Sequence, residues 1–150
     1  MNTKSMLQQL GVSLVGVLGA ASSLYAATPL SQLPPEHTQG IASFVSGGVS
    51  EDEARRFEAA AKRYPLVVQL FEHAGGSTEY TADAHVRITD RHDRVVLDQK
   101  ADGPFMLVHL PAGDYRVAAS LNGHAQPARP VHVTDGGHAR ATFVFPQNAG

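Results

Sequence analysis

From Tyr64 to the end of the chain, apolar and polar residues alternate with a period of two, and turn residues interrupt the pattern every eight to twelve positions. Side chains of a β-strand point alternately to its two faces, so this period is typical of strands with one buried face. Seven segments carry the pattern: 64–72, 79–90, 94–99, 104–110, 113–122, 128–135 and 139–146. Seven short strands separated by regular turns predict a seven-stranded antiparallel β-sandwich over residues 64–147.

Segment 79–90 shows the alternation clearly. Its apolar residues fall on one face and its polar residues on the other, with Ala82, Ala84, Val86 and Ile88 set against Asp83, His85, Arg87 and Thr89. This division predicts a sheet with one solvated side. The segments between the predicted strands are too short for the crossover helices that parallel strands require, which argues against a parallel α/β fold.

Residues 50–63 predict one α-helix before the strands. Apolar side chains recur at three- and four-residue steps and form a narrow stripe, namely Ala54, Phe57, Ala60, Ala61 and Tyr64. Three acidic residues on the opposite side each precede a basic residue by four positions, an order that favours the helix by roughly a few tenths of a kcal/mol per pair. Pro65 prevents the helix from continuing.

The predicted helix begins with a capping box, Ser50-x-x-Glu53. In this motif the serine hydroxyl accepts a hydrogen bond from the Glu53 amide, and the Glu53 carboxylate reaches back to the Ser50 amide. Gly47 and Gly48 precede the box, and we interpret them as a hinge. A phosphate cradle is disfavoured because the three acidic residues at 51–53 would repel an anion at the helix N-terminus.

Residues 27–49 carry prolines at positions 29, 34 and 35 and show no sustained periodicity, which predicts an extended tether. Ile41, Phe44 and Val45 are its apolar cluster. The sequence leaves open whether this cluster docks on the domain or stays free.

The first 26 residues have the anatomy of a secretory signal peptide. Lys4 is followed by an uncharged apolar stretch from Leu10 to Ala21 and by small residues around the expected cleavage site after Ala26. A retained membrane anchor is the alternative, but this stretch is shorter than the about 20 residues that a spanning helix needs. We therefore expect a periplasmic or secreted protein.

Composition limits the partners of the mature chain. Cleavage removes Lys4 and leaves eleven basic against fourteen acidic residues, spread evenly over 124 positions. Without a basic patch, neither nucleic acid nor an anionic membrane surface is an expected partner. The chain has no cysteine, so its stability must come from packing rather than from disulfides.

Segment 103–124, GPFMLVHLPAGDYRVAASLNGH, contains the most specific pattern in the chain. Pro111 fixes φ at a first turn position, Gly113 can adopt a positive φ, and Tyr115 is expected to face inward. The segment has an aromatic residue, then a Leu-Pro-x-Gly turn, then Tyr-x-Val. This order resembles the pattern of carboxypeptidase regulatory-like domains, which are small β-sandwiches related to the transthyretin-like superfamily. The matching residues are Phe105, Leu110, Pro111, Gly113, Tyr115 and Val117, with Ala112 at the usual second proline.

The wider layout is similar to that of a set of small exported proteobacterial proteins of unknown function. The shared elements are Gly47-Gly48, Asp52-Glu53, Arg63-Tyr64-Pro65 and the hairpin that begins at Gly103-Pro104. This resemblance covers nearly all of the chain from about Ser46. It implies a fold and export, but it carries no assigned activity.

No catalytic set is recognisable in the sequence. There is no GxSxG motif and no cysteine nucleophile. The carboxypeptidases that carry regulatory-like domains bind zinc through an HxxE element, and no histidine here has a glutamate three residues later. A transthyretin-like hydrolase would be expected to end in Tyr-Arg-Gly-Ser, whereas this chain ends in FVFPQNAG. We expect neither an enzyme nor a cofactor.

Eight histidines leave metal binding as an alternative. Asp83 and His85 lie on a predicted polar strand face with Arg87, and His132 is placed similarly, so Asp83, His85 and His132 are candidate ligands for zinc or copper. Weak carbohydrate binding is a second alternative, in which Tyr80 is the aromatic ring expected to be exposed. The leading hypothesis is an exported, non-catalytic binding or accessory module whose partner is an unknown protein or a cell-envelope component.

Overall fold

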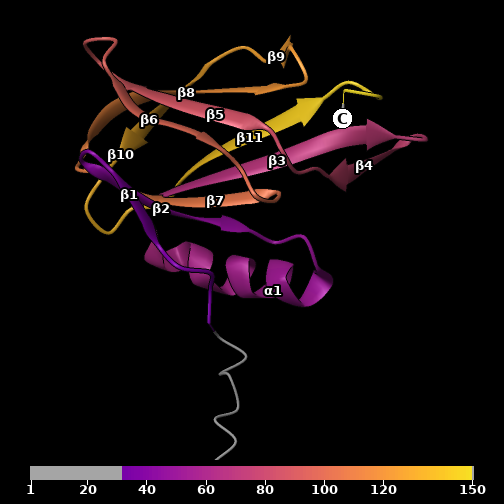
Figure 1. Cartoon of the computed structure of the whole chain (residues 1–150). Coiled ribbons are helices and arrows are strands. Elements are labelled where there is room, and N and C mark those ends of the chain that lie inside the picture. Colours follow the sequence, from indigo (N-terminus) through magenta and orange to yellow (C-terminus); the bar gives the residue numbers. More distant parts are fainter. Residues whose placement is uncertain (1–31, 150) are drawn as a thin grey trace, which may run out of the picture.

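The computed structural model describes residues 32–149, in which two β-sheets lie face to face and one α-helix lies against the outer side of one sheet (Figure 1). Sheet A contains β1 (His37–Gln39), β2 (Ala42–Gly47), β3 (Leu66–Ala74), β4 (Ser77–Tyr80), β7 (Phe105–His109) and β11 (Ala139–Phe145). Sheet B contains β5 (His85–Asp90), β6 (Val95–Lys100), β8 (Gly113–Leu121), β9 (His124–Ala125) and β10 (Arg129–Val133). Helix α1 (Glu51–Ala60) continues into a 3₁₀ turn, η1 (Ala61–Arg63).

The strand order in sheet A is β1-β2-β7-β3-β11, with β4 also beside β3, and the order in sheet B is β10-β8-β5-β6, with β9 also beside β8. The seven predicted strands correspond to β3, β5, β6, β7, β8, β10 and β11. The structure adds β1, β2 and β9, divides the predicted strand 79–90 between the end of β4 and β5, and pairs β11 with β3 in parallel. The prediction of seven purely antiparallel strands is therefore corrected, because alternation shows which face of a strand is buried but not the direction of its neighbour.

The main core lies between the two sheets. Val86, Ile88 and Val117 of sheet B and Val68 and Phe143 of sheet A have no exposed side-chain surface. Burying a side chain of this size contributes roughly 1.5–3 kcal/mol. The core is thus built from the same alternation that predicts the strands.

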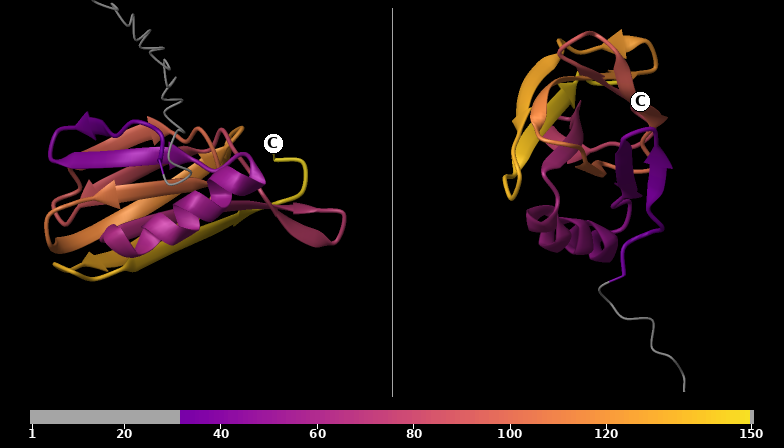
Figure 2. Two further views of the ribbon diagram at one scale, coloured as in Figure 1. Left: turned by 90° about the horizontal axis from the view of Figure 1, so that it is seen from below. Right: turned by 90° about the vertical axis from the view of Figure 1, so that its left-hand side faces the viewer.

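Strand β7 is apolar on both faces because sheet A is covered on both sides. Met106 and Val108 point into the main core, whereas Phe105 and Leu107 contact a second cluster under α1. Figure 2 shows α1 lying across the outer side of sheet A. Phe57 of α1 is fully buried in this second cluster, with its ring centroid 5.7 Å from that of Phe105.

The helix cap agrees with the sequence at Ser50 and differs at Glu53. The hydroxyl of Ser50 accepts a hydrogen bond from the Glu53 amide at 3.2 Å. The Glu53 carboxylate, however, accepts from the amide of Val49 at 3.2 Å, one residue before the expected donor. Gly48 has a φ of +94°, and this turn aims the Val49 amide at the first turn of the helix.

Gly47 and Gly48 are sites of close packing as well as a turn. A Cβ atom on Gly48 would lie 2.6 Å from the Phe105 ring. A Cβ atom on Gly103 would lie 2.3 Å from the Gly47 carbonyl oxygen. The glycine pair therefore lets β2, the loop before β7 and the helix start come together.

The prediction of an extended tether over residues 27–49 is wrong from His37 onward, because the chain forms the β1–β2 hairpin of sheet A there. Phe44 and Val45 are buried, whereas Ile41 at the turn is 60% exposed. Their apolar cluster docks because β2 pairs along β7 and places one side chain toward each of the two cores.

The predicted signal peptide and the first residues of the tether lie outside the described residues. Within residues 32–149, no helix is both long enough and apolar enough to cross a membrane.

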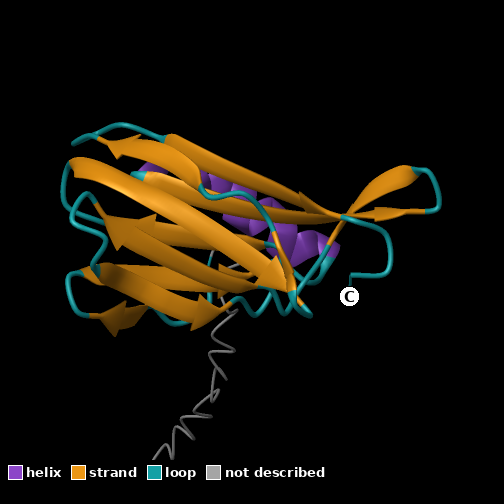
Figure 3. Ribbon diagram, turned by 90° about the horizontal axis from the view of Figure 1, so that it is seen from above, coloured by secondary structure: helices purple, strands orange, loops and turns teal. Residues whose placement is uncertain are grey.

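The β3–β4 hairpin extends beyond the two facing sheets (Figure 3). All four residues of β4 are exposed.

Candidate functional site

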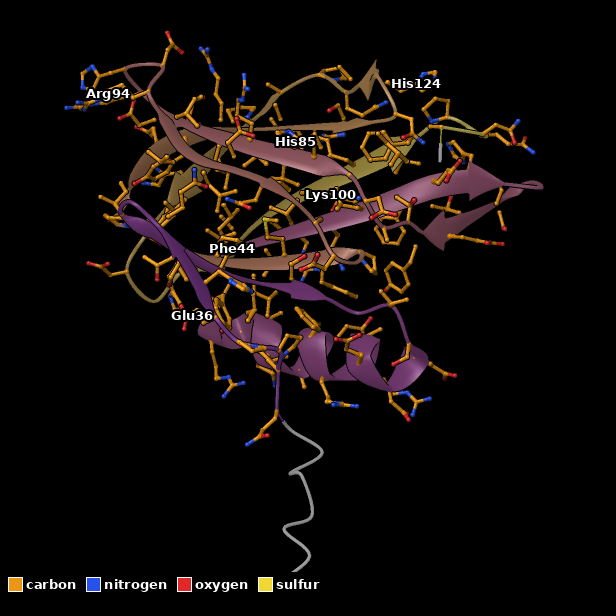
Figure 4. The ribbon with its side chains drawn as sticks, in the orientation of Figure 1. Glu36, Phe44, His85, Arg94, Lys100 and His124 are labelled. Atoms are coloured by element: carbon orange, nitrogen blue, oxygen red, sulfur yellow. The ribbon has the colours of Figure 1, made fainter. Side chains whose placement is uncertain are left out.

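The face that the sequence marks as polar is the outer side of sheet B. His85 and Arg87 project from β5 on this side and are exposed, while Val86 between them enters the core. Figure 4 shows His85 on the side of the molecule opposite α1. The prediction of one solvated sheet face is therefore correct for these two residues.

Asp98 of β6 joins His85 and Arg87 into one network. Its Oδ2 accepts hydrogen bonds from Nε and Nη2 of Arg87 at 3.1 and 2.9 Å. Its Oδ1 is buried and lies 2.7 Å from Nε2 of His85. The carboxylate therefore holds the Arg87 guanidinium by two hydrogen bonds, while the His85 imidazole lies beside its other oxygen.

Sequence analysis missed Asp98 as a member of this site. Asp98 lies directly opposite Arg87 in the β5–β6 pairing. Writing 79–90 and 94–99 as an antiparallel hairpin would have placed the two charges side by side. The contact between Asp98 and Arg87 could therefore be predicted from the register of the two strands, but not from a sequence motif.

A depression of about 260 Å³ lies beside this network. Ala118 and Ser120 of β8 line it, and His85, Arg87 and Gln126 stand around them. Small side chains beside longer polar ones leave a hollow in an otherwise solvated sheet face. This hollow accommodates one side chain or a small polar group, with the imidazole, guanidinium and amide as hydrogen-bonding groups.

The three predicted metal ligands do not come together. Asp83 precedes β5, has a φ of +67°, and its carboxylate pairs with the Lys100 ammonium at 2.9 Å. His132 of β10 lies 2.6 Å from the Asp114 carboxylate, measured from Nδ1.

The register of β8 shows the separation between the two histidines. His85 lies opposite Ser120 and His132 lies opposite Asp114. These two β8 positions are about 20 Å apart at roughly 3.3 Å per residue, which is far beyond the span of one metal site. Within residues 32–149, no group of three or more potential ligands is close enough to hold a metal ion.

Tyr80 is 44% exposed, but its ring is not free. It stacks on Phe71 with a centroid separation of 5.0 Å and contacts Phe105 at 5.2 Å. Its hydroxyl donates to Glu58 at 3.0 Å. Burial raises the pKa of Tyr80, and the hydrogen bond to Glu58 raises it further. The ring is thus part of the contact between β4 and α1, which reduces the surface that a sugar ring would need.

The hairpin motif has a structural role in the described chain. Tyr115 faces inward, as predicted, and its hydroxyl donates to the Pro111 carbonyl at 2.8 Å. Gly113 has a positive φ of 159° and begins β8. Burial raises the pKa of Tyr115, and the nearby Asp90 charge adds to this rise. These residues close the β7–β8 turn, and Gly113 and Tyr115 also line a depression of about 380 Å³ beside the loop at 90–94.

A comparison with protein-family models and with curated proteins finds no match for this chain. The resemblance to carboxypeptidase regulatory-like domains therefore stays a prediction from the Phe105–Val117 pattern.

Proposed function

We propose that this chain is an exported, non-catalytic binding module, a β-sandwich of the carboxypeptidase regulatory-like type that follows a signal peptide over residues 1–26. It acts in the periplasm or after secretion. It contacts a protein or cell-envelope partner through the outer face of sheet B.

The observation that carries the proposal is the hollow at Ala118 and Ser120 beside the His85–Asp98–Arg87 network. Asp98 already holds the Arg87 guanidinium beside the hollow, so a partner that docks there meets a donor whose freedom is already restricted. Restricting donors in advance lowers the entropic cost of binding. Helix α1 covers the equivalent face of sheet A, so sheet B offers the open face.

Site-specific photo-crosslinking in cells tests the binding face. A photoreactive residue at Gln126 is expected to give a discrete adduct. Ala118→Arg fills the hollow and should abolish this adduct. The matched control is Ala74→Arg, which introduces the same side chain at a half-buried alanine on the β3–β4 hairpin and should leave the adduct intact. An adduct that survives Ala118→Arg, or no adduct at all, contradicts the proposed face.

Export and the absence of catalysis have their own tests. The mature protein from the periplasm should have the mass of a chain that begins at Ala27. The purified protein should turn over no ester, peptide or ureide substrate. A turnover that a single substitution abolishes would show an enzyme and overturn the non-catalytic part of the proposal.

A further inference from the structure

A second depression, of about 260 Å³, lies where α1 ends and is formed by three segments that are distant in sequence. We call it the loop pocket. It is lined by residues 62–65, by 109–110 at the end of β7, and by 134–138 in the β10–β11 loop. The two views in Figure 2 show this end of α1 beside the β10–β11 loop. An adjoining depression of about 240 Å³ shares Lys62 and His138 and extends to Arg140.

Two cations of the loop pocket lack a carboxylate partner. Within residues 32–149, neither Lys62 nor Arg63 forms an ion pair. Five other basic side chains form ion pairs, namely Arg55, Arg87, Arg94, Lys100 and Arg116. The remaining four contact uncharged groups, namely Arg56, Arg91, Arg129 and Arg140. Two cations that no carboxylate of the described chain neutralises therefore stand next to each other at this pocket.

The acidic groups near the loop pocket are few, and most have other partners. Asp135 is the carboxylate among the lining residues. Glu58 lines the adjoining depression and accepts from Tyr80. Glu36 accepts a hydrogen bond from the Ser43 hydroxyl. Burial is the main cause that raises the pKa of Tyr64, and the nearby Glu36 charge adds to this rise. The two cations thus face one lining carboxylate.

The walls of the loop pocket are held in place. Tyr64 is 9% exposed, and its ring lies against that of His109 with 4.4 Å between centroids. His109 is exposed beside it. On the other side the Gly137 amide donates to the Thr134 carbonyl at 3.0 Å, and Gly136 has a φ of +72°. The loop therefore has a defined shape.

We propose that the loop pocket binds a small anion through a carboxylate or phosphate group, with Lys62 and Arg63 as charged donors. His109 and His138 add imidazole groups beside them. The pocket has room for one such group and a short attached chain. This inference is independent of the partner face on sheet B, because the two surfaces share no residue.

Titration of the mature protein with inorganic phosphate, followed by amide chemical shifts, tests the proposal. Saturable shifts are expected at residues 62–64 and 134–138. The double variant Lys62→Ala/Arg63→Ala should weaken binding by about tenfold or more, since it removes both charged donors from the pocket. The control Lys100→Ala/Arg116→Ala removes the same charge from sheet B and should change the affinity less than about twofold.

A gain of affinity separates a binding role from a purely structural one. Asp135→Asn removes the lining carboxylate and should strengthen phosphate binding by about three- to fivefold. A folding defect cannot produce this gain. Three results would each overturn the proposal. The first is chemical shifts that do not saturate, and the second is an equal loss of affinity in the two double variants. The third is a melting temperature that Lys62→Ala/Arg63→Ala lowers without any loss of affinity. The last outcome would mean that the two cations serve only to compensate the C-terminal end of α1.

Discussion

The backbone amide of Asp98 donates a 2.9 Å hydrogen bond to Oε1 of Gln39, and the Gln99 side-chain amide donates to the same oxygen at 3.2 Å. Gln39 belongs to β1 at one edge of sheet A, and Asp98 belongs to β6 at the edge of sheet B. One side chain thus joins the two sheets along this side. It also supports the strand whose carboxylate holds His85 and Arg87.

We expect Gln39→Ala to lower the free energy of unfolding by about 1–2 kcal/mol, because it leaves the half-buried Asp98 amide without its acceptor. Urea unfolding measures the change. Thr38→Ala, at the exposed neighbouring position of β1, is the control and should change the stability by less than about 0.5 kcal/mol. Equal effects of the two substitutions would show that the bond between the sheets contributes nothing.

Gly103→Ala should destabilise the fold by about 1–3 kcal/mol through overpacking, since the new Cβ would lie 2.3 Å from the Gly47 carbonyl oxygen and only a backbone shift relieves that contact. Gly123→Ala provides the comparison. That position has a φ of +84° but open space around it, so its cost is backbone strain of roughly 1 kcal/mol. Thermal unfolding of both variants should rank Gly103→Ala as the less stable. The reverse order would contradict a close contact between Gly103 and Gly47.

Ser50→Ala should cost about 1 kcal/mol, because the Glu53 amide loses its acceptor at the helix N-terminus. Ser50→Asp keeps an acceptor at the same position and should retain most of the stability. Chemical unfolding followed by circular dichroism compares the two variants. A loss of the same size in both would mean that the hydroxyl does not cap α1.

The three tyrosines of the described chain predict a drop in stability at alkaline pH. Burial is the largest cause that raises the pKa of Tyr64, Tyr80 and Tyr115 above the ordinary value of 10.0. The folded state therefore holds these protons more tightly than the unfolded state. The resulting stability is fully present below the unfolded pKa and is lost as the pH rises through the folded values.

Phenolate absorbance measures this effect. In the folded protein the titration should have its midpoint above that of the same protein in concentrated urea. Tyr115→Phe should remove one raised component and also the hydrogen bond to Pro111. Identical titrations in the two solvents would contradict the burial of these hydroxyls.

The features that depend on residues a few positions apart could be predicted from the sequence. Alternation placed seven of the strands, the stripe through Phe57 placed the helix, and the Ser50 motif placed its first residue. For the candidate site, the same alternation placed His85 and Arg87 on one exposed face. It failed for Asp83, because a left-handed backbone at that residue precedes β5 and takes Asp83 out of the strand.

Which surfaces meet could not be predicted in this way, because it depends on contacts between distant segments. Four features join segments that are distant in the chain. They are the parallel pairing of β11 with β3, the pairing of the β1–β2 hairpin with β7, the hydrogen bond between Gln39 and Asp98, and the loop pocket. Burial of apolar surface is the dominant driving force and has no preferred direction. The period of a segment therefore states which of its sides is buried, whereas the partner of that side depends on the packing of the whole chain.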